Sequence, residues 1–256
     1  MAPAMTNGSS IVNGNVLRRG KTNRASVLRL KVLSTLFCWL ALGLNESPAQ
    51  MNVAASRWEP AIRAFEKSDR IHPPPQNAVL FIGASAIRKW TSLAGDFPGV
   101  PVINRGFGGS QIADSTAFAG RIIFPYHPRV IVLYGGDNDL AAGKSPQQVA
   151  AEYTDFVRTV RAKLPQARIV FISIKPSPIR WKRLKDKVIE TNRRIAAMKG
   201  NGLFFVDIFS RMLDAQGNPR KDLFLADGLH PNENGYRLWA SLIRPDLGSD
   251  STAAEK

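Results

Sequence analysis

The sequence at residues 78–85 reads Ala78-Val79-Leu80-Phe81-Ile82-Gly83-Ala84-Ser85. An apolar run without an intervening polar side chain is typical of a strand that is buried on both faces, as in a parallel sheet. The glycine that ends the run allows the backbone to turn sharply. We therefore expect a buried strand that presents Ser85 at the edge of the sheet where the strand's carboxyl end lies.

Four further apolar runs follow along the chain, and segments with helical periodicity separate them. This alternation predicts an α/β fold in which helices cover both faces of a parallel sheet. An earlier helix carries Trp58 and ends at the proline run of residues 73–75. The predicted strands are Ala78 to Gly83, Val100 to Asn104, Val130 to Gly135, Ile169 to Ile174 and Leu203 to Ile208, and the later helices are Pro146 to Leu164, Lys182 to Lys199 and Glu233 to Ile243.

Glycine-rich polar turns follow the first three predicted strands. In open parallel sheets, functional groups gather in the loops at the carboxyl ends of the strands. Tight turns are needed by any such fold, so the glycines alone do not indicate a function. A dinucleotide fingerprint would need glycine at position 111, where this chain has Gln111, and no Walker lysine pattern occurs. The sequence therefore disfavours nucleotide binding.

The histidines are few, namely His72, His127 and His230. His72 precedes three prolines, and His127 comes just before the third strand, at the edge of the sheet away from the functional loops. His230 follows the fifth strand, three residues after Asp227, and a carboxylate at that spacing can orient an imidazole. A solvated loop histidine is the commoner explanation for such a pair alone. Its position among the other loops favours a general base.

A serine nucleophile activated by this histidine should stand at the carboxyl end of another strand. Ser85 does so, whereas Ser110 comes late in a glycine-rich turn and Ser173 falls within the fourth predicted strand. Ile87 occupies the position where the nucleophile elbow of α/β-hydrolases has glycine. The residues therefore indicate a serine hydrolase of a different design.

The order of these segments resembles the SGNH hydrolases, also called GDSL-like esterases and lipases, from about Ala78 to Pro245. Gly136-Asp137-Asn138-Asp139 fits the family's Gly-x-Asn-Asp pattern, and the Asp-x-x-His pair lies downstream. The resemblance implies that Ser85 is the nucleophile and that Asp227 and His230 are the acid and base of a catalytic triad. It further implies an oxyanion hole formed by Gly109 and Asn138.

One position departs from the family pattern, because Ala84 stands where the family has aspartate between glycine and serine. That aspartate is not part of the triad, so its loss bears on loop geometry and substrate preference. The family's fold is a flavodoxin-like three-layer α/β/α sandwich whose five parallel strands have the order 2-1-3-4-5. Its chemistry implies an esterase that forms an acyl-enzyme and needs neither metal nor cofactor.

The natural ester stays open, because the same fold and triad serve many substrates. The chain has no long apolar insertion that could form a lipase lid, which favours short-chain or carbohydrate esters over triglycerides. Alternatives are a lipase or lysophospholipase, a thioesterase, and a catalytically impaired module that binds cell-surface polysaccharide. Arg105 and the basic segment at residues 175–182 would suit an anionic or sugar substrate, but solvated charges are commoner, so no substrate residue is assigned.

The first 49 residues predict an export signal. A basic segment precedes an apolar stretch from Val32 to Leu44, which is short for a membrane span, and Ser47-Pro48-Ala49 resembles a signal-peptidase site. We expect Sec-type export to the periplasm or exterior, with an uncleaved anchor or a start at Met51 as alternatives. The predicted organisation is a leader at residues 1–49, a helix and linker at 50–77, the hydrolase domain at 78–246 and a tail at 247–256.

The chain is basic, with a formal net charge of +15. The leader holds six basic residues and one acidic residue, so the remainder keeps +10, and the single cysteine, Cys38, also lies in the leader. A basic surface attracts anionic partners, but no nucleic-acid-binding signature accompanies it. We expect small-molecule or carbohydrate ester substrates, with weak association with an anionic membrane or cell-wall polymer as an open alternative.

Overall fold

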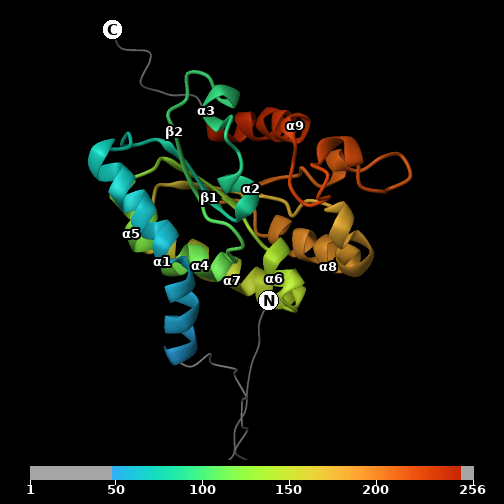
Figure 1. Cartoon of the computed structure of the whole chain (residues 1–256), viewed down its shortest axis with the longest axis horizontal. Helices are drawn as coiled ribbons and strands as arrows, with labels where there is room; N and C mark the ends of the chain where they lie inside the picture. Colours follow the sequence, from blue (N-terminus) through green and yellow to red (C-terminus); the bar gives the residue numbers. More distant parts are fainter. Residues whose placement is uncertain (1–47, 249–256) are drawn as a thin grey trace, which may run out of the picture. The chain divides into compact units, whose positions relative to one another are not determined.

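A computed structural model describes the backbone of residues 48–248 and side chains from Arg57 onward (Figure 1). The predicted leader, apart from Pro48 and Ala49, lies outside the described residues, as does the tail beyond Gly248. Within residues 48–248, no helix is both long and apolar enough to cross a membrane.

The centre of the fold is a sheet of five parallel strands in the order β2-β1-β3-β4-β5. This arrangement confirms the predicted fold class and strand order. β1 is paired on both sides, and its side chains are buried in a core on each face of the sheet, which explains its uninterrupted apolar sequence. The strands are β1 Val79–Gly83, β2 Val102–Gly106, β3 Val130–Tyr134, β4 Arg168–Ile172 and β5 Leu203–Val206.

Helices cover both faces of the sheet (Figure 1). One face carries α1, α4, α5, α7 and α8, and the other carries α2, α3 and α9. The helix bounds are α1 Pro48–Ile71, α2 Ser85–Arg88, α3 Leu93–Asp96, α4 Ile112–Ala117, α5 Ala119–Ile122, α6 Asp137–Ala141, α7 Pro146–Lys163, α8 Pro178–Ala196 and α9 Glu233–Ile243.

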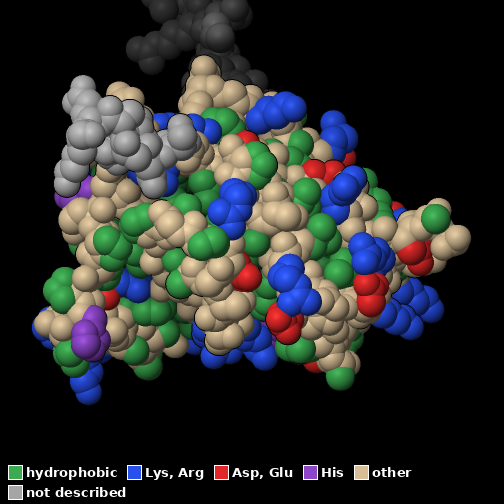
Figure 2. All heavy atoms as spheres, turned by 90° about the horizontal axis from the view of Figure 1, so that it is seen from above, with side chains coloured by type: hydrophobic (Ala, Val, Ile, Leu, Met, Phe, Trp, Pro, Cys, Tyr) green, Lys and Arg blue, Asp and Glu red, His purple; other side chains and the backbone are tan. Residues whose placement is uncertain are grey.

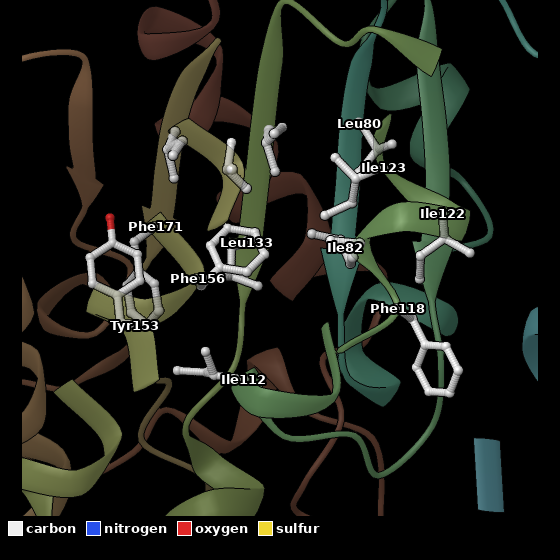
Figure 3. Close-up of a cluster of buried hydrophobic side chains, with 14 of the residues drawn as sticks. Leu80, Ile82, Ile112, Phe118, Ile122, Ile123, Leu133, Tyr153, Phe156 and Phe171 are labelled. Atoms are coloured by element: carbon white, nitrogen blue, oxygen red, sulfur yellow. The ribbon is translucent and has the colours of Figure 1, made fainter. Parts of the chain in front are cut away.

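Side chains alternate between two cores along each strand, as the two-residue period of a strand requires. Leu80 and Ile82 of β1 point to the core beneath α1, α4, α5, α7 and α8, and Val79 and Phe81 point to the opposite core. Figure 3 shows the first of these cores, where Leu133 and Phe171 of neighbouring strands meet helical side chains. Burial of both faces thus holds the strand ends in fixed relative positions.

Several predicted element boundaries were wrong. The second strand was expected at Val100 to Asn104 and spans Val102–Gly106, and the fifth was expected to reach Ile208 but ends at Val206.

Two further predicted boundaries were wrong and bear on the site. The fourth strand was expected to reach Ile174 but ends at Ile172, because the amide of Asn192 in α8 binds both backbone groups of Ile174 at 2.8 and 3.0 Å. The helix expected from Lys182 begins at Pro178 instead, since a proline at the first helical position loses no helical hydrogen bond. Both changes bring α8 close to the carboxyl edge of β4.

Ion pairs fasten α1 to the domain. Arg121 of α5 binds Glu59 and Glu66 of α1, each at 2.7 Å. Arg105 of β2 is buried, binds Asp69 at 2.6 Å and donates to the hydroxyl of Tyr126 at 3.1 Å. Arg105 therefore joins β2 to α1. It is not available to an anionic or sugar substrate, the role that its sequence position suggested.

Candidate active site

Ser85 is the first residue of α2, immediately beyond the carboxyl end of β1. Gly83 makes the turn possible, because its φ is +137° and a Cβ built there would lie 1.8 Å from the carbonyl oxygen of Tyr134. Any side chain at this position would clash with β3. The backbone N–H of Ser85 has no hydrogen bond within the part of the chain that the structure describes. It is therefore free to act as a donor to a ligand.

His230 reaches this serine from the loop between β5 and α9. Its Nε2 lies 2.9 Å from Ser85 Oγ, and its Nδ1 lies 2.6 Å from Asp227 Oδ2. The other carboxylate oxygen of Asp227 accepts the backbone N–H groups of Leu229 and His230 at 2.9 and 3.0 Å. The structure thus brings Ser85, His230 and Asp227 into one hydrogen-bonded chain.

The charge of Asp227 is stabilised by its hydrogen bonds. Burial alone would raise the pKa of Asp227, but the bonds from the His230 side chain and from two backbone N–H groups outweigh it and hold the pKa below its usual value. The carboxylate stays ionised at neutral pH and orients the Nδ1–H tautomer of the imidazole. Nε2 then carries a lone pair toward Ser85, as a general base requires.

Asn138 lies near the start of α6, beyond the carboxyl end of β3. Its Nδ2 donates to the carbonyl oxygen of Ser110 at 3.0 Å, and its Oδ1 accepts from Arg180 Nη2 at 3.1 Å. Gly109, with a φ of +79°, precedes Ser110 in the loop after β2. That loop is tied to β1 because the N–H of Phe107 donates to the carbonyl of Gly83 at 2.9 Å. The described hydrogen bonds do not link Asn138 or Gly109 directly to Ser85.

Asp139 was not predicted as a site residue, yet it joins two of the loops. Its buried carboxylate accepts the N–H of Ile112 at 3.2 Å and the N–H of Gly136 at 3.0 Å. Burial and the neighbouring Glu152 together raise the pKa of Asp139 to about 7, against the opposing attraction of Lys144. The family pattern was the only sequence signal for this residue, and it does not reveal the partners.

A buried charge cluster lies behind Asn138. Lys175 Nζ lies 2.6 Å from Asp137 Oδ2 and donates to the hydroxyl of Tyr134 at 2.8 Å. Burial would raise the pKa of Asp137, but attraction by Lys175 and Arg180 outweighs it and lowers the pKa. The sequence places Lys175 and Arg180 in a basic segment that would suit an anionic or sugar substrate. Lys175 instead belongs to the interior, with 1% of its side chain exposed.

The other serines and histidines that the sequence offered as candidates do not join the chain of Ser85, His230 and Asp227. Ser173 follows β4 instead of lying within it, and its hydroxyl accepts the N–H groups of Ile208 and Phe209 at 3.0 and 2.9 Å. Ser110 is buried and uses its carbonyl to bind Asn138. His72 follows α1, and His127 adopts a left-handed turn before β3. Of these four residues, only Ser110 lies beside the predicted site.

Two adjoining hollows lie next to the loop of His230. The nearer has a volume of about 550 Å³ and is walled by Asp227, Leu225 and Ile179, of which the last two are 44% and 70% exposed. The second has about 650 Å³, contains Trp181 and Arg220, and shares Lys221 with the first. Both hollows thus offer apolar and polar groups side by side, and the nearer one meets the hydrogen-bonded chain at Asp227.

Neither the face of the molecule in Figure 2 nor the metal-ligand chemistry of the described residues points to another site. Figure 2 shows Lys and Arg side chains scattered over one face, several of them beside acidic groups, instead of gathered in one patch. No three His, Cys, Asp or Glu side chains within the described residues are arranged to hold a metal ion. The Ser85 loop and its neighbours are therefore the candidate active site.

Comparison with solved structures relates the fold to known proteins. A protein from Streptococcus pneumonia, provisionally described as a platelet activating factor, has a TM-score of 0.65 at 20% identity, with 79% of this chain and 100% of that chain covered. A GDSL-like lipase from Bacteroides thetaiotaomicron has a TM-score of 0.63 at 18% identity and coverages of 73% and 96%. An acetyl-xylooligosaccharide esterase from Geobacillus Stearmophilus has a TM-score of 0.53 at 14% identity and coverages of 69% and 96%.

The sequence itself matches a known family. No curated protein matches the chain. Residues 82–238 match the profile of the GDSL-like Lipase/Acylhydrolase family, and this span includes Ser85, Asn138 and His230. The chain therefore belongs to the GDSL-like lipase/acylhydrolase family and is a hydrolase of carboxylic esters.

Proposed function

We propose that this protein is a serine esterase that hydrolyses short-chain or carbohydrate acyl esters with Ser85, His230 and Asp227 as its triad. The observation that carries the proposal is the continuous chain of hydrogen bonds from Asp227 through His230 to Ser85, with distances of 2.6 and 2.9 Å. Such a chain has the geometry of a nucleophile, its base and the group that orients the base.

The reaction begins when Ser85 Oγ attacks the ester carbonyl and His230 Nε2 takes the hydroxyl proton. The tetrahedral intermediate collapses as His230 gives that proton to the departing alcohol, which leaves an acyl group on Ser85. Water then attacks the acyl-enzyme, with His230 again accepting a proton and returning it to Ser85. The carboxylate of Asp227 stabilises the imidazolium that forms in each half of the cycle.

The developing oxyanion needs donors that are in place before the reaction. We assign this role to the backbone N–H groups of Ser85 and Gly109 and to the side-chain amide of Asn138. One Nδ2 hydrogen of Asn138 is used by the Ser110 carbonyl, and the second remains for the oxyanion. These donors would stabilise the negative charge that develops on the carbonyl oxygen.

The two hollows support an ester whose surface is partly apolar and partly polar, because each of them offers both kinds of group. Ile179 and Leu225 offer apolar surface in the nearer hollow, whereas Trp181 and Arg220 offer stacking and hydrogen bonding in the farther one. A sugar ring presents both an apolar face and hydroxyl groups, so a carbohydrate ester can contact the apolar and the polar groups of the hollows together.

The test is release of p-nitrophenol from its acetate and octanoate esters by the wild-type protein and by Ser85→Ala. We expect hydrolysis of the acetate to fall to the uncatalysed background in Ser85→Ala. Ser241→Ala, which changes an exposed serine of α9, serves as the matched control and should keep wild-type turnover. Equal turnover by wild type and Ser85→Ala would contradict the triad and favour the alternative of a polysaccharide-binding module.

We also propose that the chain is exported and cleaved after Ala49. The proposal rests on the basic and apolar segments of the leader, which lie outside the described residues. Cleavage there would remove only Pro48 and Ala49 from α1. N-terminal sequencing of the protein recovered from the periplasm or medium should begin at Gln50. Recovery in the cytosol with Met51 as the first residue would contradict export.

A further inference from the structure

The side-chain amide of Asn138 can serve an oxyanion in only one orientation. Its NH₂ group donates hydrogen bonds, whereas its oxygen would repel a negative charge. Rotation of the amide by 180° about the Cβ–Cγ bond exchanges the oxygen and the NH₂ group with almost no change in the shape of the side chain. Whatever fixes this rotation therefore decides whether Asn138 stabilises or opposes the proposed intermediate.

Two neighbours of opposite hydrogen-bonding character hold the amide. The carbonyl of Ser110 can only accept, and it lies 3.0 Å from Nδ2. The guanidinium of Arg180 can only donate, and its Nη2 lies 3.1 Å from Oδ1. Both contacts select the same orientation, and a flipped amide would face a carbonyl with its oxygen and a guanidinium with its NH₂.

The guanidinium is itself fixed from behind. Arg180 Nη1 donates to the carbonyl oxygen of Asp137 at 3.0 Å and lies 3.4 Å from Asp137 Oδ2. That carboxylate is 7% exposed and is held in turn by Lys175 at 2.6 Å. Because α8 begins at Pro178, Arg180 stands in the first turn of a helix and not on a free loop.

We infer that Arg180 is a positioning residue, which fixes the amide of Asn138 with its NH₂ toward the oxyanion. This inference deepens the proposed function and rests on it. The charge-assisted bond to Oδ1 also draws electron density from the amide, which makes Nδ2–H a stronger donor. Without Arg180, rotation of the amide is controlled by the Ser110 carbonyl alone.

The first experiment measures kcat and KM for p-nitrophenyl acetate in Arg180→Met. We expect kcat to fall about 10- to 100-fold, less than the loss of roughly 100- to 1,000-fold for removal of an oxyanion donor itself, with KM nearly unchanged. Arg180→Lys should lie between wild type and Arg180→Met, because one ammonium N–H can restore the bond to Oδ1. Arg183→Met, at an exposed position on the same helix, should match wild type.

The second experiment separates action through Asn138 from action on the substrate. In an Asn138→Ala background, Arg180→Met should lower kcat by no more than about twofold, since the group that it positions is gone. Wild-type turnover of Arg180→Met, or an equal fall in both backgrounds, would overturn the inference. If Arg180→Met does not fold, as judged by circular dichroism, Arg180→Lys replaces it, and its effect on kcat is compared between the wild-type and Asn138→Ala backgrounds.

The same assays distinguish this inference from the proposed function. Ser85→Ala with wild-type turnover would overturn the triad, and the Arg180 inference would fall with it. Loss of turnover in Ser85→Ala and Asn138→Ala, but not in Arg180→Met, would overturn only the role of Arg180. Loss in all three, with non-additivity between Asn138 and Arg180, is the expected result.

Discussion

Ala84 lies beneath the serine turn, and its methyl group is buried in the core cluster that contains Ile87 and Trp90. An aspartate at this position would place a carboxyl group among apolar side chains. We therefore expect Ala84→Asp to lower the free energy of unfolding by about 2 to 4 kcal/mol, as measured by urea denaturation. Ala84→Ser, which adds only a hydroxyl, should cost less. Equal stability of Ala84→Asp and wild type would show that the carboxyl group finds a partner at this turn.

Asn138 supplies the side-chain donor of the proposed oxyanion hole. We expect Asn138→Ala to lower kcat for p-nitrophenyl acetate by roughly 100- to 1,000-fold and to leave a measurable remnant, because backbone donors remain. Asn234→Ala, at an exposed position on α9, is the control and should retain wild-type kcat. An unchanged kcat in Asn138→Ala would remove this residue from the site.

Single residues differ in how well sequence predicts their place. Ser85 and His230 could be predicted to approach each other because both follow parallel strands whose carboxyl ends share one edge of the sheet. Arg180 could not, because a basic residue after a strand is usually solvated and its partner Asn138 lies 42 positions earlier. Only the packing of α8 against the β3 loop makes that contact.

At the scale of the element, α1 depends on partly buried charges for its attachment. Removing Arg105 would leave Asp69 without its guanidinium partner. We expect Arg105→Met to lower the free energy of unfolding by about 2 to 4 kcal/mol in urea denaturation. Arg63→Met removes an exposed pair within α1 and should stay within about 0.5 kcal/mol of wild type. Similar values for both variants would contradict a structural role for the Arg105 pair.

The elements themselves were largely predictable, but several of their ends were not. The helix predicted at Glu233 to Ile243 has those bounds in the structure, since its apolar face is periodic and Asn232 caps its first turn through the N–H of Gly235 at 3.0 Å. The end of β4 depends on the side chain of Asn192, which lies in the next helix. A boundary set by such a distant side chain leaves no signal in the strand's own sequence.

For the whole molecule, buried carboxylates make stability depend on pH. The pKa of Asp139 is about 7 in the folded protein, against about 3.9 in an unfolded chain. Between these values the native state binds more protons than the unfolded state, so the free energy of unfolding should fall as pH rises from about 4 to about 7. Burial raises the pKa of Asp114 as well, and this acts in the same direction. Urea denaturation at pH 5 and pH 7 measures the difference.

A substitution at a neighbour can assign this pH dependence to Asp139. Glu152→Gln removes a negative charge that helps to raise the pKa of Asp139. The loss of stability between pH 5 and pH 7 should therefore be smaller in Glu152→Gln than in wild type. Asp155→Asn, an exposed change on the same helix, should leave it unaltered. An unchanged pH dependence in Glu152→Gln would show that other groups cause it.

The contact between Ser85 and His230 spans 145 residues of the chain. A partly folded intermediate that contains only β1, β2 and β3 would present the nucleophile and Asn138 but no base. Formation of that long-range contact requires both later crossovers, which are slow steps in a parallel sheet. During refolding from denaturant, recovery of esterase turnover should therefore lag behind recovery of the helical circular dichroism signal, and its rate would report the arrival of the final strand and its loop.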